Sequence, residues 1–164
     1  MSQKMESNVS RSELFEEYYK LSAIVQSYDS YCLTIKAWGV TVSGAAIGVA
    51  FSRAGSLGVF IVAFALSLAF WLTEVRFKLF QLAHMLRVSE LENALQNNLP
   101  MTSPRIFAAF GEQSRSNLKS KRWRAVTLWP QVMLPHVFFA VLSLVLIAID
   151  VAKLIYSWRS ASRN

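Results

Sequence analysis

The chain has 164 residues, of which 54% are hydrophobic and 16% are charged. Soluble domains carry about 25% charged residues, so this composition argues against an ordinary soluble domain. Its 17 Lys and Arg residues outnumber its 10 Asp and Glu residues, which gives a net charge of +7. Because basic residues flank membrane spans on the cytoplasmic side, we attribute this excess to membrane topology and do not expect nucleic acid binding.

Three apolar stretches without any charged residue dominate the sequence, at residues 37–52, 54–73 and 125–149. A helix needs about 20 residues to cross the hydrocarbon core of a bilayer. We therefore predict an all-α integral membrane helical bundle with three transmembrane helices, the first two continuing as helices into the cytosol. The predicted parts are a cytosolic helix (1–36), a transmembrane hairpin (37–76), a cytosolic helical region (77–124), a third transmembrane segment (125–158) and a tail (159–164).

The first predicted helix begins after an S-x-x-E capping box formed by Ser10 and Glu13. From there apolar residues recur at alternating steps of four and three, a heptad seam that continues into the first apolar stretch. The seam consists of Leu14, Tyr18, Leu21, Val25, Tyr28, Cys32, Ile35, Gly39, Val42, Ala46 and Val49. We predict one continuous helix over residues 13–52, and the alternative is two helices with a bend near residues 29–31.

The second predicted helix follows a tight connection at residues 53–56 and runs to residues 97–98, with Pro100 beyond it as a stop. Trp71 suits an interfacial anchor, and Lys36 and Glu74 mark the cytoplasmic ends of the hairpin. Beyond Glu74 we predict one apolar face with charged residues off it. The face holds Val75, Leu79, Leu82 and Leu86, and the charged residues are Arg76, Lys78, Arg87 and Glu90.

A linker at residues 100–104 precedes a predicted short helix at residues 104–113 and then a basic segment. Four cations surround Trp123 immediately before the third apolar stretch: Lys119, Lys121, Arg122 and Arg124. Such a patch suits anionic lipid headgroups, with about 1 kcal/mol expected per cation. Topological anchoring alone is one alternative, and an anionic ligand such as a nucleotide second messenger is another.

The third apolar stretch contains Pro130 and Pro135, each of which tends to start or kink a helix. We expect the straight span at residues 135–156, with residues 123–134 as a candidate interfacial segment. Asp150 and Lys153 lie three residues apart near its end, a spacing that allows an intramembrane charge pair on one helical face. Solvation of both charges at the end of the span is the alternative.

Lys and Arg residues are unevenly distributed, with four before residue 37, one between the first two spans and nine between the second and third spans. The positive-inside rule therefore places the N-terminus and the long loop in the cytoplasm, and three spans place the C-terminus outside. Lys153, Arg159 and Arg163 oppose that placement of the C-terminus, and a third segment that re-enters or stays in the interface would resolve the conflict.

Small residues gather in the first span, where Ser43 precedes a G-x-x-x-G motif formed by Gly44 and Gly48. This spacing lets membrane helices approach closely. It predicts either self-association into a homo-oligomer or packing of the first span on the second, and the heptad seam favours association. A pore built by such an oligomer would be lined by Thr41, Ser43 and Ser67.

Motifs of enzymes, including phosphate-binding loops, H-E-x-x-H and G-x-S-x-G, do not occur in the sequence. We therefore expect no enzyme, no catalytic residue, no cofactor and no metal site. His84 and His136 have no second ligand at helical spacing, and we interpret each as a polar group on a wet face or at an interface. Cys32 is the only cysteine, which excludes an intrachain disulfide.

Two blocks, residues 28–45 (YDSYCLTIKAWGVTVSGA) and residues 70–78 (FWLTEVRFK), resemble segments of small multi-pass bacterial membrane proteins. The layout of about residues 13–97 is similar to that of SLATT-type effectors associated with nucleotide-signalled anti-phage defence. The resemblance implies a helical hairpin with cytosolic extensions that assembles and permeabilises the membrane. The third predicted span departs from the two-span form of that family.

Together these patterns predict a multi-pass protein of the bacterial inner membrane with a cytoplasmic N-terminus. Its expected partners are anionic lipids, further copies of the chain and a soluble protein encoded nearby. The leading hypothesis is an effector that disrupts membrane integrity or forms a pore when triggered. The alternative is a non-lytic scaffold or sensor that anchors a soluble partner through its cytosolic helices. A transporter or channel subunit is weakened by the lack of charged residues at mid-span.

Overall fold

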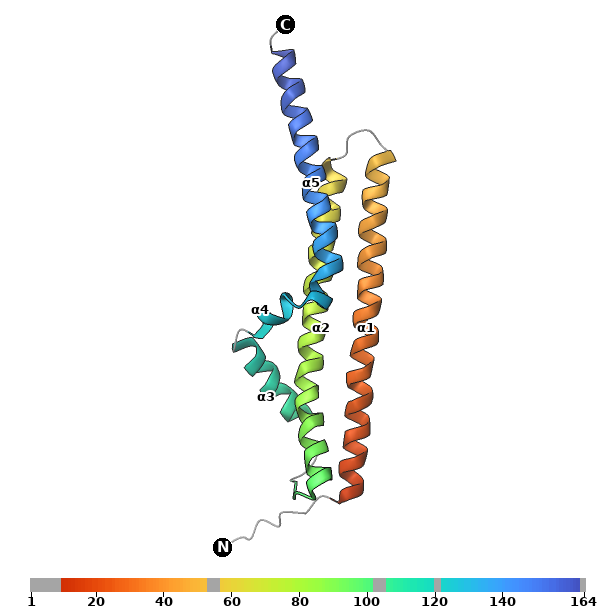
Figure 1. Cartoon of the computed structure of the whole chain (residues 1–164), viewed down its shortest axis with the longest axis vertical. Helices are drawn as coiled ribbons and strands as arrows, with labels where there is room; N and C mark the ends of the chain where they lie inside the picture. The colour runs from red at the N-terminus through yellow and green to blue at the C-terminus, as the bar shows by residue number, and fades with distance from the viewer. Residues whose placement is uncertain (1–9, 53–56, 102–105, 120–121, 163–164) are drawn as a thin grey trace. The chain divides into compact units, whose positions relative to one another are not determined.

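The computed structural model describes residues 10–52, 57–101, 106–119 and 122–162, and every regular element in these ranges is an α-helix (Figure 1). The helices are α1 (Arg11–Ser52), α2 (Leu57–Asn97), α3 (Ile106–Lys119), α4 (Arg122–Thr127) and α5 (Pro130–Ala161). The all-α fold class is confirmed. Helices α1, α2 and α5 are each long and apolar enough to cross a membrane, as the three apolar stretches predict.

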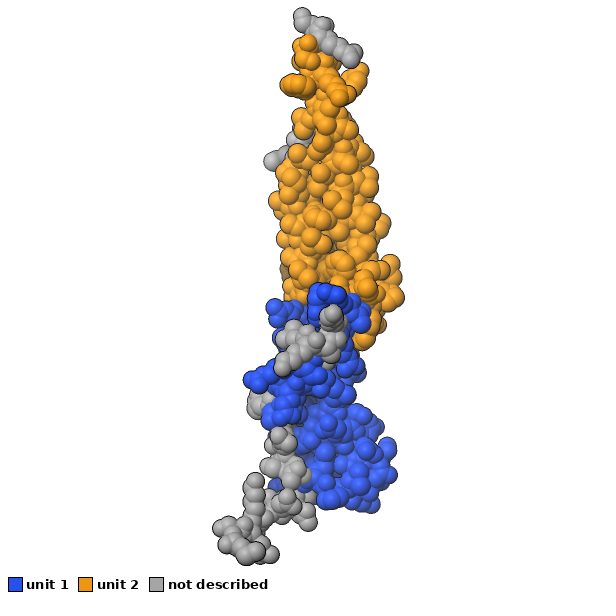
Figure 2. Space-filling view, turned by 90° about the vertical axis from the view of Figure 1, so that its left-hand side faces the viewer, with its two compact units in different colours: residues 1–32, 76–126 blue, residues 33–75, 127–164 orange. Residues whose placement is uncertain are grey.

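The chain forms two compact units, which Figure 2 colours separately. Unit 1 comprises Met1–Cys32 and Arg76–Val126, and unit 2 comprises Leu33–Val75 and Thr127–Asn164. Helices α1 and α2 each contribute residues to both units, α3 belongs to unit 1, and α5 belongs to unit 2. Nearly all of the three apolar stretches lie in unit 2, which is therefore the part suited to a membrane.

Helix α1 begins at the predicted capping box. The Ser10 backbone N–H donates to Glu13 Oε2 at 3.0 Å, and the Glu13 N–H donates to Ser10 Oγ at 3.3 Å. These reciprocal bonds satisfy two of the donors that a helix start leaves free. The helix then continues without a break through residues 29–31, so the prediction of one continuous helix is confirmed and the bend is not found.

Helix α2 ends where the sequence predicts, at Asn97. Asn98 has a φ of 50°, a left-handed conformation that asparagine adopts more readily than most residues. The Leu99 N–H donates to the Ala94 carbonyl at 3.1 Å, which satisfies one of the last acceptors of the helix. The connection predicted at residues 53–56 lies outside the described residues.

Leucines from α1 and α2 form the core of unit 1: Leu14, Leu21 and Leu91 are buried and touch Tyr18, Ile24, Val88, Leu95 and Met101. The apolar face predicted for α2 is wrong at two positions. Leu86 is exposed, whereas Arg87 is buried against Glu17 of α1. A guanidinium can enter a helix interface when a carboxylate opposite accepts its donors, and that pairing could not be read from α2 alone.

The core of unit 2 consists of Ile47, Ala50, Phe60 and Ala63, with residues of α5 packed against them. In this unit the predicted heptad seam is shifted. The buried positions of α1 are Gly39, Ser43, Ile47 and Ala50, whereas Val49 is exposed. A straight α-helix repeats every 3.6 residues, so a strict heptad seam drifts around it and a step of four replaces a step of three.

Two predicted helix boundaries need correction. Helix α5 starts at Pro130, earlier than the straight span expected from residue 135, and it runs on to Ala161. Pro130 occupies the first turn, where the missing N–H would have no partner in any case, and Pro135 is accommodated inside the helix. The short helix expected at residues 104–113 is α3, which lies at Ile106–Lys119.

Candidate functional site

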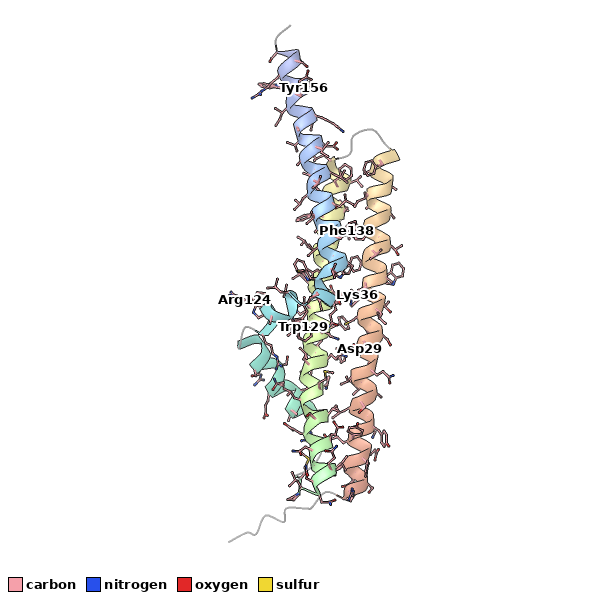
Figure 3. All side chains as sticks on the ribbon, viewed as in Figure 1. Asp29, Lys36, Arg124, Trp129, Phe138 and Tyr156 are labelled. Carbon is pink, nitrogen blue, oxygen red and sulfur yellow. The ribbon has the colours of Figure 1, made fainter. Side chains whose placement is uncertain are left out.

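A buried carboxylate joins the three long helices of unit 2. Glu74 of α2 has a side chain that is 1% exposed, and both of its oxygens have partners. Lys36 Nζ of α1 lies 2.9 Å from Oε1, and His136 Nε2 of α5 lies 3.0 Å from Oε2. We call these three residues the Glu74 cluster. Figure 3 labels its member on α1, Lys36.

The sequence places these side chains at the margins of the apolar stretches. Lys36 directly precedes the first stretch and Glu74 directly follows the second, so an antiparallel hairpin brings them to the same level. His136 comes from within the third stretch. The interpretation of His136 as a group on a wet face is wrong, because its side chain is 2% exposed and contacts Glu74.

Gly39 provides the space for the imidazole ring. A Cβ atom at this position would lie 3.0 Å from His136 Cε1 and 3.3 Å from the Cβ of Phe70. These distances are shorter than normal carbon–carbon contacts, so any larger residue would push against the ring or against α2. The close approach of α1 to α5 at the cluster therefore depends on a glycine.

The Glu74 cluster surrounds a buried carboxylate with two donor groups. A buried carboxylate is stable as an ion only if donors surround it, and here an ammonium and an imidazole supply them. Imidazole and carboxylate side chains are among the groups that accept and donate protons in protein sites. Within the described ranges, no group of three or more His, Cys, Asp or Glu residues is arranged to hold a metal ion.

Serines make a second polar contact inside unit 2. Ser67 Oγ donates to the Ala63 carbonyl at 2.9 Å, and Ser43 Oγ lies 3.2 Å from Ser67 Oγ. The Ser67 proton is thus committed to Ala63, so the Ser43 hydroxyl is the donor between the two serines. Ser143 of α5 is also fully buried, and its Oγ has no hydrogen-bond partner among the described residues.

The two glycines of the G-x-x-x-G motif have different surroundings. A Cβ at Gly44 would lie 3.7 Å from Cε1 of Phe139, so Gly44 packs against α5 within the chain. A Cβ at Gly48 would meet nothing within 4 Å. Gly44 therefore packs on the third span, a partner that neither predicted alternative named, and a Cβ at Gly48 has open space around it.

The basic patch is described only in part. Arg122 and Arg124 of α4 are exposed, and the Arg124 guanidinium lies 5.4 Å from the centre of the Trp123 ring (Figure 3). Lys121 and the side chain of Lys119 lie outside the described residues. The predicted pair on α5 is present, with Lys153 Nζ 3.5 Å from Asp150 Oδ1, although the Lys153 side chain is exposed.

Unit 1 contains an ion pair that the sequence did not predict. Arg87 Nε lies 3.0 Å from Glu17 Oε1, and Arg87 Nη1 lies 3.2 Å from Glu90 Oε2. Burial acts to lower the pKa of Arg87, but hydrogen bonds and charge attraction from the two glutamates outweigh it and raise the pKa. The signal that could have found the pair is the position of Glu17 between Leu14 and Leu21, on the buried side of α1.

His84 is the second histidine whose environment differs from the prediction. Its ring stacks on Phe110 of α3, with centroids 4.7 Å apart, and on Tyr28 of α1 at 5.8 Å. Burial lowers the pKa of His84. A histidine on a wet face would show neither contact, and the stack instead fastens α3 to the α1–α2 pair of unit 1.

Comparisons with known proteins identify no relative: no protein-family model, no curated protein and no solved structure matches the chain.

Proposed function

We propose that the protein is an oligomeric effector of the bacterial inner membrane that permeabilises the membrane when it is triggered, in anti-phage defence. The observation that carries this proposal is the Glu74 cluster, an ionisable group buried between the three spans of unit 2. Charged side chains inside membrane bundles are expensive, and they usually mark paths for ions or protons.

The membrane part leaves most of its surface for lipid or for further copies. In the apolar windows of α1, α2 and α5, 22%, 28% and 22% of the residues are buried within the chain. Close-packed membrane bundles bury small residues at helix–helix contacts, and the open face at Gly48 is one place where a second copy would fit. These features support assembly into a homo-oligomer.

Unit 1 is the part on which a trigger would act. Its α1 and α2 segments are joined by ion pairs, Arg87 with Glu17 and Lys78 with Asp29. The same two helices continue into unit 2, where they carry Lys36 and Glu74. A ligand or partner that favours a different arrangement of these pairs would shift the population of the whole helix pair.

The test is the membrane potential of phage-infected bacteria that express the full chain, read with a potential-sensitive dye. We expect wild-type cells to depolarise and Glu74→Gln cells to retain their potential, because the amide cannot carry the carboxylate charge. Glu92→Gln is the matched control, since Glu92 is an exposed residue of the same helix. It should depolarise like the wild type.

Equal membrane potentials in wild-type, Glu74→Gln and empty-vector cells would contradict the proposal. Recovery of a stoichiometric soluble partner from those polarised cells would instead favour the non-lytic scaffold or sensor. The same outcome would leave the Glu74 cluster with a structural role, namely joining α1, α2 and α5.

A further inference from the structure

Three buried serines of unit 2, Ser43, Ser67 and Ser143, repeat the pattern of the Glu74 cluster. Each lies seven positions from one cluster member on the same helix: Ser43 follows Lys36, Ser67 precedes Glu74, and Ser143 follows His136. Seven residues make about two helical turns, or about 10 Å, so each serine faces the same side of its helix as its counterpart. Because α1 and α5 run opposite to α2, all three serines lie on the same side of the cluster along the helices. We call these residues the serine layer.

One hydroxyl of the serine layer has no hydrogen-bond partner among the described residues. Ser143 is 0% exposed, and its Oγ has no partner in the part of the chain that the structure describes. A buried hydroxyl without a hydrogen bond is unfavourable, and water is the usual partner where polar groups converge inside a protein. The layer therefore has the chemistry to hold water inside the span.

An apolar barrier follows on the side away from the cluster. Ile47 lies one turn beyond Ser43 on α1, and Ala63 lies one turn beyond Ser67 on α2; both are buried. Together with Ala50 and Phe60 they pack against Leu142, Leu146 and Ile147 of α5. We call this set the apolar plug. A constriction of this kind blocks a path by excluding water from it.

The Glu74 cluster, at the end away from the apolar plug, reaches the surface of the protein at Lys36. The Lys36 side chain is 27% exposed, whereas the side chains of Glu74 and His136 are 1% and 2% exposed. A proton can thus reach the carboxylate past Lys36, and the ammonium repels other cations of the same charge. That arrangement favours protons, which pass along hydrogen bonds without an ion having to enter.

We propose that unit 2 contains a proton path made of the Glu74 cluster and the serine layer and closed by the apolar plug. This inference rests on the proposed function and names the species that crosses the membrane. A hydronium ion outside the site releases a proton through hydrogen-bonded water to Glu74 and leaves water behind, while the carboxylate becomes a carboxylic acid. Water that enters the space of about 10 Å between the two layers then takes the proton from the acid and relays it to the serine layer, and the carboxylate is restored. Only O–H bonds break and form, and no oxidant or co-reactant is needed.

The test uses a variant that opens the apolar plug, so it does not depend on a trigger. Full-length protein is reconstituted into liposomes that hold a pH-sensitive dye, and valinomycin with a potassium gradient drives protons inward. Ile47→Thr places a hydroxyl in the plug, and Ile61→Thr is the matched control, because Ile61 is an exposed residue of the same unit. We expect several-fold faster proton entry with Ile47→Thr than with Ile61→Thr.

Two further variants locate the path in the Ile47→Thr background. Glu74→Gln removes the acceptor and should return proton entry to the level of Ile61→Thr. Ser143→Ala removes one oxygen atom from the serine layer with little change in volume, and it should slow proton entry while leaving the Glu74 cluster in place. Circular dichroism and a monodisperse elution profile of each purified variant confirm that it is folded.

Parallel liposomes filled with calcein separate this inference from the proposed function. Faster proton entry with calcein retained supports the proton path. Calcein release by the wild type or by Ile47→Thr means a wide pore, which agrees with a permeabilising effector but overturns the proton path. Equal proton entry with Ile47→Thr and Ile61→Thr, or no effect of Glu74→Gln or Ser143→Ala, also overturns it.

Discussion

Two carboxylates are buried in the described ranges, Glu17 in unit 1 and Glu74 in unit 2, and each faces a cation on a neighbouring helix. Removing one partner of a buried ion pair costs about 3–5 kcal/mol, because the other charge is left without compensation. Such pairs therefore fix which faces of α1 and α2 meet. At Glu74 the imidazole of His136 adds a third helix to the same contact.

A single methyl group added at Gly39 should destabilise the packing of α1 against α5 at the Glu74 cluster. Gly39→Ala places a Cβ 3.0 Å from the His136 ring. Overpacking of this kind costs about 1–3 kcal/mol, and the better helix propensity of alanine returns about 1 kcal/mol. We expect a net loss of unfolding free energy of about 1 kcal/mol, read as a lower Tm in detergent.

Gly58→Ala is the control for this prediction. A Cβ at Gly58 meets nothing within 4 Å among the described residues, and Gly58 lies in the first turn of α2, so Gly58→Ala should not lower the Tm. A Tm of Gly39→Ala at or above that of Gly58→Ala would show that the imidazole moves aside freely, and Gly39 would then not position His136.

At the scale of elements, local sequence signals predict helix ends well and helix partners poorly. The capping box at Ser10 and the stop before Pro100 lie within a few residues of the helix ends they determine, so the ends of α1 and α2 could be predicted. Glu74 and His136 lie 62 residues apart, and nothing along either helix indicates that they meet. The start of α5 was misplaced because two prolines, five residues apart, carry the same signal.

Prediction of the buried helix faces from periodicity is limited in the same way, because it uses one helix at a time. Periodicity predicts the leucine core of unit 1, because Leu14 and Leu21 both belong to the predicted seam. It fails at Arg87, since hydropathy alone assigns a guanidinium to the surface. It also drifts by one residue in α1, where Ser43 pairs with Ser67 at a position that the heptad assigns to Val42. Polar partners across helices decide these positions, and a single helix does not contain that information.

Docking of α3 should depend on pH through His84, which lies outside the apolar spans. Burial between Phe110 and Tyr28 lowers the pKa of His84 from its ordinary value of 6.5. The undocked state therefore binds a proton more readily than the docked state. The stabilisation of α3 docking by the stack is fully present above about pH 6.5. It is lost as the pH falls from about 6.5 toward the lower pKa of His84 in the docked state.

Hydrogen exchange of the α3 amides provides the measurement for His84. We expect less protection at about pH 5.5 than at about pH 7.5, after correction for the intrinsic pH dependence of exchange. In His84→Gln the difference should shrink, because the amide does not titrate, whereas carboxylates common to both proteins still contribute. The same pH dependence in wild type and His84→Gln would exclude His84 as its source.

At the scale of the whole molecule, unit 2 exposes more apolar surface than water would tolerate. Its large exposed hydrophobic side chains include Trp38, Phe51, Leu72, Phe138 and Leu154. Patches of this extent occur at membrane-facing or subunit-facing surfaces. The sequence predicts this surface correctly as charge-free stretches, but it does not divide the surface between lipid and further copies. Gly48 allows that division to be tested.

Gly48→Leu should lower the mass of the detergent-solubilised particle, measured by light scattering, without lowering the Tm of the chain. The physical reason is that a Cβ at Gly48 has open space within 4 Å among the described residues, so added bulk there hinders close approach of a second helix. Gly58→Leu is the matched control, because Gly58 is equally open and lies outside the small-residue motif. Gly44→Leu differs from both, since it crowds Phe139 and should reduce the Tm. An unchanged particle mass for Gly48→Leu would contradict assembly through this face and leave the face at Gly48 to lipid.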